Sequence, residues 1–192
     1  MDQTIIKNVP EVYSRIVEKS KEIGFTMPSD IYIGSLLKTL IASKPKANIL
    51  ELGTGIGLSL SWMIDGMDGE SRLISVDNDP ELIKNVKSLL EDDPRVEIIC
   101  EDGSKWIKTY NGDKFDVIFA DAWPGKYSAI NEILDLIQVG GFYIIDDMVP
   151  QPNWPEGHEK NVKDLIQYLE NRKDITLTKM NWSTGVILAV KK

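Results

Sequence analysis

Five short apolar runs in this chain each end in a carboxylate, and acids at such positions can bind a ligand. The acidic ends are Glu51, Asp77, Glu101-Asp102, Asp121 and Asp146-Asp147. Apolar runs separated by helical patterns are typical of buried parallel strands joined by right-handed crossovers, so all five ends are expected on one edge of one sheet. Open α/β sheets bind ligands at that edge. Carboxylates there suit a cationic ligand, a donor of hydrogen bonds or a metal ion.

A glycine-rich turn follows the first of these runs. The segment ELGTGIGLS, residues 51–59, carries three glycines at alternate positions between a predicted strand and a predicted helix. The glycines let the backbone approach a ligand closely, and the helix offers unpaired amides to an anion. A dinucleotide pyrophosphate and the carboxylate of S-adenosylmethionine both fit these amides. Glu51 favours the second ligand, because a carboxylate repels a diphosphate and attracts an ammonium or a sulfonium.

Two further acids follow the next two predicted strands. Asp77 lies 20 residues after the last glycine of the turn, where it can accept hydrogen bonds from two ribose hydroxyls. Asp102, followed by Gly103 and Ser104, suits an exocyclic amine such as adenine N6. Each acid could instead be solvated or cap a helix. For Asp77 that alternative is weaker, because Asp79 already stands at a predicted cap position.

Composition favours one compact domain without a nucleic-acid or membrane surface. The chain has 192 residues, 42% of them hydrophobic and 27% charged, with a net charge of −8 and no basic cluster. We expect a single domain over 1–192, with N-terminal helices in 1–47 and the core in 48–192. The N-terminus lacks a basic region followed by an apolar one, and no apolar stretch approaches about eighteen residues, so we expect a soluble cytoplasmic protein. The single cysteine, Cys100, is expected to be buried.

Apolar periodicity predicts the elements that position these residues. Helices are expected over 9–17 and 31–42, after which strands alternate with helices. The expected strands are 48–51, 72–76, 96–100, 116–120 and 142–145, and Gly140-Gly141 is expected to end the helix before the last of them. A helix over 159–170 then precedes two strands, 175–180 and 185–190. The short turn between these two makes them antiparallel.

From about Met27 to its end, the chain resembles class I S-adenosylmethionine-dependent methyltransferases, and among them the small O-methyltransferases related to catechol O-methyltransferase. The resemblance lies in ILELGTGIGLS, VDNDP, EDGS and VGGFYII. It implies an α/β, Rossmann-like fold with a seven-stranded, mostly parallel sheet, an antiparallel C-terminal strand pair and helices on both faces. It also implies a cofactor site. The methionine portion would contact Glu51, Gly53, Gly55 and Ser59, the ribose Asp77, and the adenine Asn78, Asp102 and Ser104. Thr54, Gly57, Gly103 and Asp121 would also belong to the cofactor site.

The resemblance also implies a magnesium site and a catalytic base. In the family, an aspartate after the fourth strand and an Asp-Asn pair after the fifth hold Mg²⁺, which here corresponds to Asp121, Asp146 and Asp147. Three oxygen ligands suit Mg²⁺, although Asp147 replaces an asparagine and adjacent aspartates can simply be solvated. Pro124 stands where the family has its catalytic lysine. Candidates for the catalytic groups are therefore Asp121 and Lys126, with His158 as an alternative base and the metal itself as another means of activating the hydroxyl.

Tryptophans indicate the substrate class. Trp123 and Trp154 are expected at the mouth of the site, where flat walls suit a flat aromatic acceptor. Trp182 lies in the last turn, and a packing role is the alternative for it and for Trp154. Trp62 and Trp106 lie within predicted helices and are expected in the core.

The sequence thus predicts a methyltransferase that moves the methyl group of S-adenosylmethionine to a hydroxyl of a small aromatic acceptor with the help of Mg²⁺. A metal-independent small-molecule methyltransferase and a noncatalytic S-adenosylmethionine-binding protein stay open. A nicotinamide dehydrogenase is disfavoured by Glu51. Nucleic-acid amino methylation is disfavoured because the fourth strand ends in Asp-Ala-Trp-Pro. The sequence does not fix the oligomeric state, but enzymes of the family it resembles often form homodimers through N-terminal helices, and the amphipathic stretch 9–17 could supply such a contact.

Overall fold

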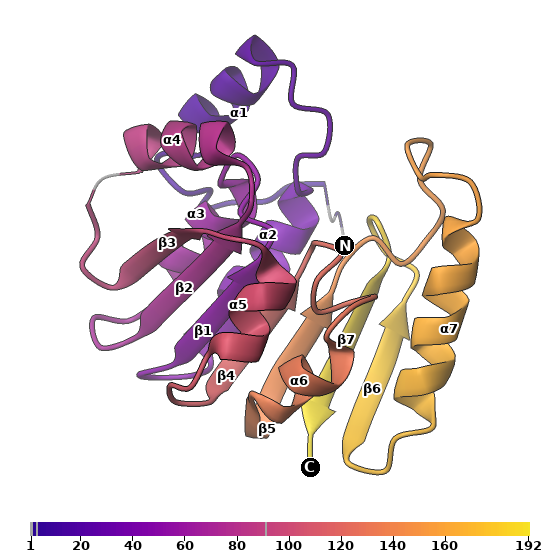
Figure 1. Ribbon diagram of the computed structural model, residues 1–192. Helices are drawn as coiled ribbons and strands as arrows, with labels where there is room; N and C mark the ends of the chain where they lie inside the picture. Colours follow the sequence, from indigo (N-terminus) through magenta and orange to yellow (C-terminus); the bar gives the residue numbers. More distant parts are fainter. Residues whose placement is uncertain (1, 3, 91) are drawn as a thin grey trace.

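A computed structural model describes residues 2, 4–90 and 92–192 of the chain. Within these residues, seven strands form one sheet in the order β3-β2-β1-β4-β5-β7-β6 (Figure 1). β7 is antiparallel to both of its neighbours and the other pairs are parallel, so six strands share one direction. The strands are β1 (Asn48–Leu52), β2 (Arg72–Asp77), β3 (Val96–Cys100), β4 (Phe115–Ala120), β5 (Ile137–Ile145), β6 (Ile175–Met180) and β7 (Val186–Lys191). The predicted fold class is confirmed.

Helices cover both faces of the sheet, because successive residues of each buried strand point to opposite sides. Leu50 belongs to an apolar cluster that includes residues of α5, α6 and α7, whereas Ile49 belongs to the cluster that includes residues of α2, α3 and α4. α1 lies over α3, where Tyr13 contacts Trp62 at a ring distance of 5.8 Å. The helices are α1 (Tyr13–Glu22), α2 (Ile31–Ala42), α3 (Leu58–Gly66), α4 (Pro80–Leu89), α5 (Gly103–Thr109), α6 (Ile130–Asp135) and α7 (His158–Glu170). None in the described ranges is both long and apolar enough to span a membrane.

Two expectations, one about Gly140-Gly141 and one about Cys100, are wrong. Gly140-Gly141 does not end a helix, since α6 stops at Asp135 and β5 already begins at Ile137. The two glycines lie inside β5, where its register with β4 shifts and Gly140 has a φ of 79°. Cys100 is exposed because it is the last residue of β3, which forms an edge of the sheet.

The first helix also begins later than predicted, at Tyr13 rather than near residue 9. Its apolar face includes the fully buried Ile16 and packs with Ile56 and Leu58 of the same chain. The side chains proposed for a dimer contact are therefore partly used within the chain. The homodimer stays a prediction.

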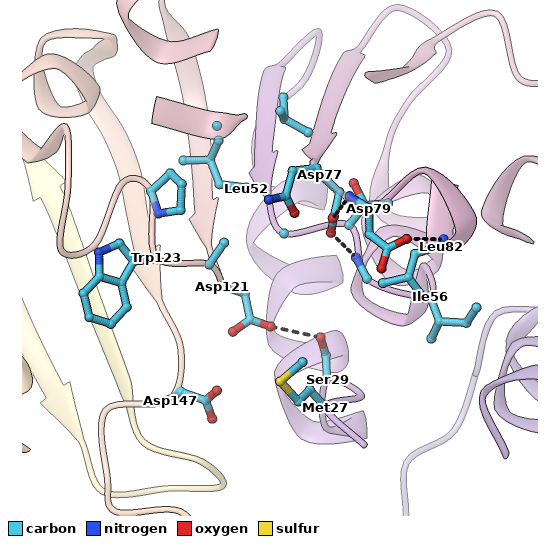
Figure 2. A pocket seen from close by; sticks show the side chains of 18 of the residues that line it. Met27, Ser29, Leu52, Ile56, Asp77, Asp79, Leu82, Asp121, Trp123 and Asp147 are labelled. Carbon is cyan, nitrogen blue, oxygen red and sulfur yellow. Dashed lines mark hydrogen bonds between the residues drawn. The ribbon is translucent and has the colours of Figure 1, made fainter. Parts of the chain in front are cut away.

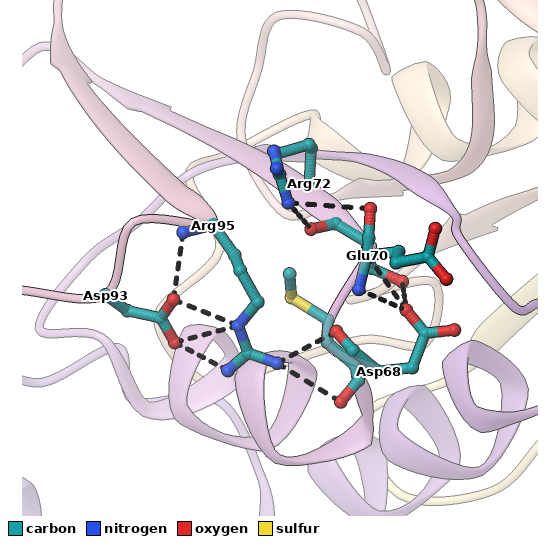
Figure 3. Close-up of polar contacts among 7 residues, drawn as sticks. Asp68, Glu70, Arg72, Asp93 and Arg95 are labelled. Atoms are coloured by element: carbon teal, nitrogen blue, oxygen red, sulfur yellow. Dashed lines mark hydrogen bonds and ion pairs between the residues drawn. The ribbon is translucent and has the colours of Figure 1, made fainter.

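The loops at the amino ends of the strands are fixed by charged side chains (Figure 3). Arg95 pairs with Asp93 and donates to the carbonyls of Met67 and Asp68. Asp68 accepts from the amide of Lys46 and the hydroxyl of Ser71, and these bonds lower its pKa. These bonds fix the loops before β2 and β3, whereas ligands of open α/β sheets bind at the opposite, carboxyl edge.

Candidate functional site

The strand order reverses between β1 and β4, which opens a crevice at the carboxyl edge of the sheet. A cavity of about 550 Å³ lies there, a volume within the range of about 300 to 1,000 Å³ found for small-molecule sites. We call it the glycine-turn cavity (Figure 2). Eleven of the residues selected from the sequence line it: Gly53, Thr54, Gly55, Asp77, Asn78, Asp102, Gly103, Ser104, Asp121, Trp123 and Asp147.

The glycine turn is shaped by backbone angles that favour glycine. Gly53, Gly55 and Gly57 have φ values of 100°, 53° and 90°. A Cβ atom at Gly53 would lie 2.7 Å from the main-chain oxygen of Asp121, so the turn also packs closely against the end of β4. Gly57 immediately precedes α3 and does not line the cavity.

Asp77 connects the glycine turn to the following helix. Its Oδ2 accepts a hydrogen bond from the amide of Gly55, and its Oδ1 accepts one from the amide of Asp79, both at 2.9 Å (Figure 2). Asp79, and not Asp77, caps α4 by accepting from the amides of Glu81 and Leu82. The weaker alternative for Asp77, a helix cap, is thereby excluded, and its carboxylate stands at the cavity wall.

Asp102 combines the two roles that the sequence left open. It caps α5 by accepting from the amide of Lys105 at 2.8 Å, and it lines the cavity. The neighbouring hydroxyl of Ser104 is hydrogen-bonded to that of Ser128 at 2.8 Å. This bond joins the first turn of α5 to the loop after β4, where sequence reasoning selected Asp121 and Trp123 but not Ser128.

Glu51 and Ser59 lie beneath the cavity rather than on its wall. Glu51 is fully buried, accepts from Ser59 Oγ at 2.6 Å and also accepts from Ser75 Oγ. The Ser75 hydroxyl is in turn hydrogen-bonded to that of Thr54 at 2.6 Å. Burial raises the pKa of Glu51 to about 8, although both serine hydroxyls act in the opposite direction. The charge that the sequence assigned to Glu51 is therefore not presented to a ligand.

A second cavity of about 320 Å³, the acidic cavity, adjoins the first. The two share residues 27–29 and both aspartates Asp121 and Asp147, which we call the junction. Ser29 donates to Asp121 Oδ2 at 3.2 Å across this junction (Figure 2). Sequence reasoning missed residues 26–30 and 151–153, because they are loops without a motif and meet the sheet edge only in the tertiary structure. The other lining residues of the acidic cavity are Thr26, Asp30, Asp146, Gln151, Pro152, Asn153 and Thr184.

Lys126 lies behind the junction and lines neither cavity. Its side chain is 5% exposed, and Nζ donates to the main-chain oxygen of Asp146 at 2.8 Å. The same Nζ is 3.7 Å from Asp121 Oδ1. Burial raises the pKa of Asp121, and the nearby Lys126 ammonium opposes this rise. The structure therefore brings Lys126 to the predicted aspartates but not into contact with a ligand cavity.

The side chains do not form the predicted magnesium site. Mg²⁺ needs carboxylate oxygens at about 2.0 to 2.1 Å in nearly octahedral geometry. Oδ1 of Asp146 instead accepts from the Thr184 hydroxyl and the Asp147 amide, while the Lys126 ammonium stands beside Asp121. Within residues 2, 4–90 and 92–192, no three histidine, cysteine or acidic side chains are arranged to hold a metal ion. The prediction of Mg²⁺ is not confirmed.

Trp123 and Trp154 occupy different environments. Trp123 is 51% exposed and lines the glycine-turn cavity. Trp154 lines neither cavity and packs on His158, with 4.6 Å between the ring centres. His158 is buried, and its Nε2 is 3.3 Å from Tyr127 Oη. The packing alternative therefore describes Trp154, and His158 has no direct access to either cavity.

The remaining tryptophans have structural roles. Trp62 and Trp106 are 2% and 6% exposed, as expected for the core. Trp182 contacts Tyr32 at a ring distance of 5.7 Å and packs against the apolar cluster of α2 and α3.

Comparisons with known proteins agree on one family. A model described as O-methyltransferase matches residues 9–192. A Mycobacterium ulcerans protein named for the same activity is 22% identical over 179 residues, which cover 88% of this chain and 79% of that protein. A Mycobacterium marinum relative is 25% identical over the same shares of the two chains.

Solved structures show the same fold. An O-methyltransferase from Streptomyces achromogenes involved in tomaymycin synthesis, in complex with SAM (S-adenosylmethionine), has a TM-score of 0.86 at 22% identity and covers 98% of this chain and 93% of its own. An O-methyltransferase from Bacillus cereus in complex with SAH (S-adenosylhomocysteine) has a TM-score of 0.84 at 20% identity, covering 98% and 94%.

Proposed function

Because this chain belongs to the O-methyltransferase family, we propose that it transfers the methyl group of S-adenosylmethionine to a hydroxyl of a small acceptor. Family membership confirms the predicted class of enzyme, a methyltransferase. One observation supports the reaction most directly: two cavities adjoin and share the junction formed by residues 27–29, Asp121 and Asp147. The glycine-turn cavity would hold the cofactor and the acidic cavity the reacting end of the acceptor. The SAM- and SAH-bound structural relatives support this choice of cofactor.

The residues of the glycine-turn cavity suit the three parts of the cofactor. Asp77 would accept from the ribose hydroxyls, because its carboxylate is fixed at the cavity wall by two backbone amides. Asp102 and Ser104 would face the adenine. The methionine portion would then extend along the glycine turn toward Asp121, whose carboxyl oxygens would accept hydrogen bonds from the ammonium group and, when ionised, attract the sulfonium.

Methyl transfer at the junction requires the acceptor oxygen, the methyl carbon and the sulfur to lie in line. A carbon–oxygen bond forms as the sulfur–carbon bond breaks, and the hydroxyl proton is lost. Fixed positions for both molecules account for most of the acceleration expected of such a reaction. Asp121 lines both cavities, so we propose that its carboxylate, rather than the Lys126 amine, accepts the proton that the hydroxyl loses.

The acceptor is small because the acidic cavity is only about 320 Å³. Its lining includes Asp30, Gln151 and Asn153, which suit polar groups that donate hydrogen bonds. Trp123 stands at the glycine-turn cavity beside the junction and offers a flat surface. We propose that a hydroxyl-bearing end enters the acidic cavity while an aromatic part lies against Trp123.

Cofactor binding can be measured before any acceptor is known. Calorimetry should show binding of S-adenosylmethionine and S-adenosylhomocysteine to the full chain, and no binding of NAD. Asp77→Ala should lower the affinity for S-adenosylhomocysteine by about 1.5 to 3 kcal/mol, the scale of a charge-assisted hydrogen bond. Asp164→Ala is the matched control, since Asp164 is exposed on α7 and pairs there with Lys160. Binding of NAD in place of S-adenosylmethionine would overturn the proposal.

The acceptor can then be sought by screening catechols, flavonoids and hydroxycinnamates for release of S-adenosylhomocysteine. A second candidate function, a noncatalytic S-adenosylmethionine-binding protein, is favoured by one observation: Lys126 reaches neither cavity. Cofactor binding without turnover of any compound in the screen would support that candidate.

A further inference from the structure

The ammonium group of Lys126 is buried where it has acidic neighbours from two strands. The side chain is 5% exposed, and Nζ lies between the main-chain oxygen of Asp146 at 2.8 Å and Asp121 Oδ1 at 3.7 Å. Burying a charged group is unfavourable unless it is paired and hydrogen-bonded. Asp121 after β4 provides the opposite charge for this cation, and the main-chain oxygen of Asp146 after β5 accepts its hydrogen bond.

The loop that carries Lys126 directs it inward. Gly125 has a φ of 85°, and its amide donates to the carbonyl of Ser128 at 2.8 Å. The amides of Lys126 and Tyr127 both donate to the carbonyl of Trp123, at 3.3 and 2.9 Å. Tyr143 of β5 donates from its hydroxyl to the carbonyl of Gly125. The side chain of Lys126 is thus held under the junction by a turn that is itself attached to the sheet.

The Lys126 ammonium supplies positive charge to the carboxylates that a metal ion would otherwise compensate. The three carboxylates of Asp121, Asp146 and Asp147 follow two adjacent strands, and their mutual repulsion calls for a cation. Lys126 provides one positive charge within the cluster. A divalent ion bound to Asp121 and Asp146 would have to share the space beside Asp121 with this ammonium, at a cost of like-charge repulsion.

We propose that Lys126 is the resident cation of this acidic cluster, and that it orients Asp121 toward the junction so that the protein works without a divalent metal ion. This inference rests on the proposed function for the methyl transfer itself. Lys126 is then a positioning residue that acts through Asp121. It differs from the general base that the sequence suggested, because it contacts no ligand cavity.

The test measures divalent-cation binding by the full chain without an acceptor. Mn²⁺ and Mg²⁺ are titrated by calorimetry and by their effect on Tm into the wild type, Lys126→Ala, Lys126→Arg and Lys160→Ala. Lys160 is the matched control because it is an exposed lysine in an ion pair on α7. We expect neither ion to bind the wild type, Lys126→Arg or Lys160→Ala in the millimolar range. Lys126→Ala should bind Mn²⁺ at least about tenfold more tightly, because a unit charge close to the ion has been removed.

Binding of Mg²⁺ or Mn²⁺ by the wild type below millimolar concentration, with loss of that binding in Asp121→Asn, would overturn the proposal. Lys126→Met keeps the aliphatic stem and takes the place of Lys126→Ala if the latter does not fold. The proposal would also be overturned if neither Lys126→Ala nor Lys126→Met binds Mn²⁺ more tightly than the wild type. These outcomes are independent of the proposed function, whose failure would appear as absence of S-adenosylmethionine binding by the wild type. With an acceptor in hand, turnover should be unchanged after chelator treatment.

Discussion

Replacing Glu51 by glutamine should change how the stability of this protein depends on pH. Glu51 is fully buried among three hydroxyl-bearing residues and has a pKa raised to about 8, mainly because burial disfavours the ionised form. In the unfolded chain the ordinary value of 4.5 applies. The folded protein therefore keeps this proton over a pH range in which the unfolded chain has lost it.

Proton linkage determines whether the free energy of unfolding rises or falls with pH. The stabilisation due to the protonated Glu51 is fully present below its unfolded pKa and is lost as the pH rises through the folded value near 8. Between these values one extra proton is bound by the folded state. The free energy of unfolding should then fall by about 1.4 kcal/mol per pH unit on account of Glu51. From pH 5 to pH 8 this amounts to about 4 kcal/mol at most.

Urea unfolding at several pH values between 5 and 8 tests this prediction. Glu51→Gln keeps a neutral side chain of the same shape, so its curve should be flatter than that of the wild type by about 1.4 kcal/mol per pH unit. Asp121 and Asp146 also have raised pKa values, and the difference between the two proteins removes their common contribution. Glu97→Gln, at an exposed position of β3, controls for the substitution. Parallel curves for wild type and Glu51→Gln would refute the reasoning.

Three further substitutions test individual parts of the site. Asp102→Ala should lower the free energy of unfolding by about 1 kcal/mol, because a helix cap is lost, and should also lower the affinity for S-adenosylhomocysteine. Asp102→Asn should restore the free energy of unfolding. Denaturation measures the first effect and calorimetry the second. Gly53→Ala should weaken cofactor binding and stability together, because its Cβ would lie 2.7 Å from the Asp121 oxygen; an unchanged Tm would contradict the turn geometry. Trp154→Ala should reduce stability by about 1 to 3 kcal/mol and leave cofactor affinity intact, since Trp154 packs on His158; a rise in the acceptor KM at unchanged Tm would instead support its predicted position at the mouth of the site.

Local chemistry made much of the fold predictable from the sequence. The bounds of β3 agree with the expected strand, because its apolar residues lie between clear turn signals. Asp79 caps α4 as expected, since an aspartate before Pro-Glu satisfies free amides at a helix start. These features depend on neighbours in the chain. The bounds of β3 and the start of α4 were therefore predicted correctly.

The position of Glu51 could not be predicted from the sequence alone. The sequence suggested that β1 ends at Glu51, but the strand continues to Leu52 and pairs Glu51 with Ser75 of β2. One additional residue of strand keeps the carboxyl between the sheet and α3, where Ser59 and Ser75 contact it. Strand ends are uncertain by more than one residue from sequence alone, and a change of one residue moves a side chain to another environment. Lys126 and Trp154 were misplaced for a related reason, because loop packing fixes their directions.

The carboxylates at the acidic edge of the sheet have different roles, because their surroundings in the structure differ. Asp77 and Asp102 accept hydrogen bonds from backbone amides, and Glu51 is held as a neutral acid, so the fold itself uses much of this acidity. Asp121 and Asp147 are the acids at the junction of the two cavities. Under the proposed function, a sulfonium would lie beside them and lose its positive charge as the methyl group leaves. The Lys126 ammonium beneath Asp121 would still compensate the charge of that carboxylate after the sulfonium charge has disappeared.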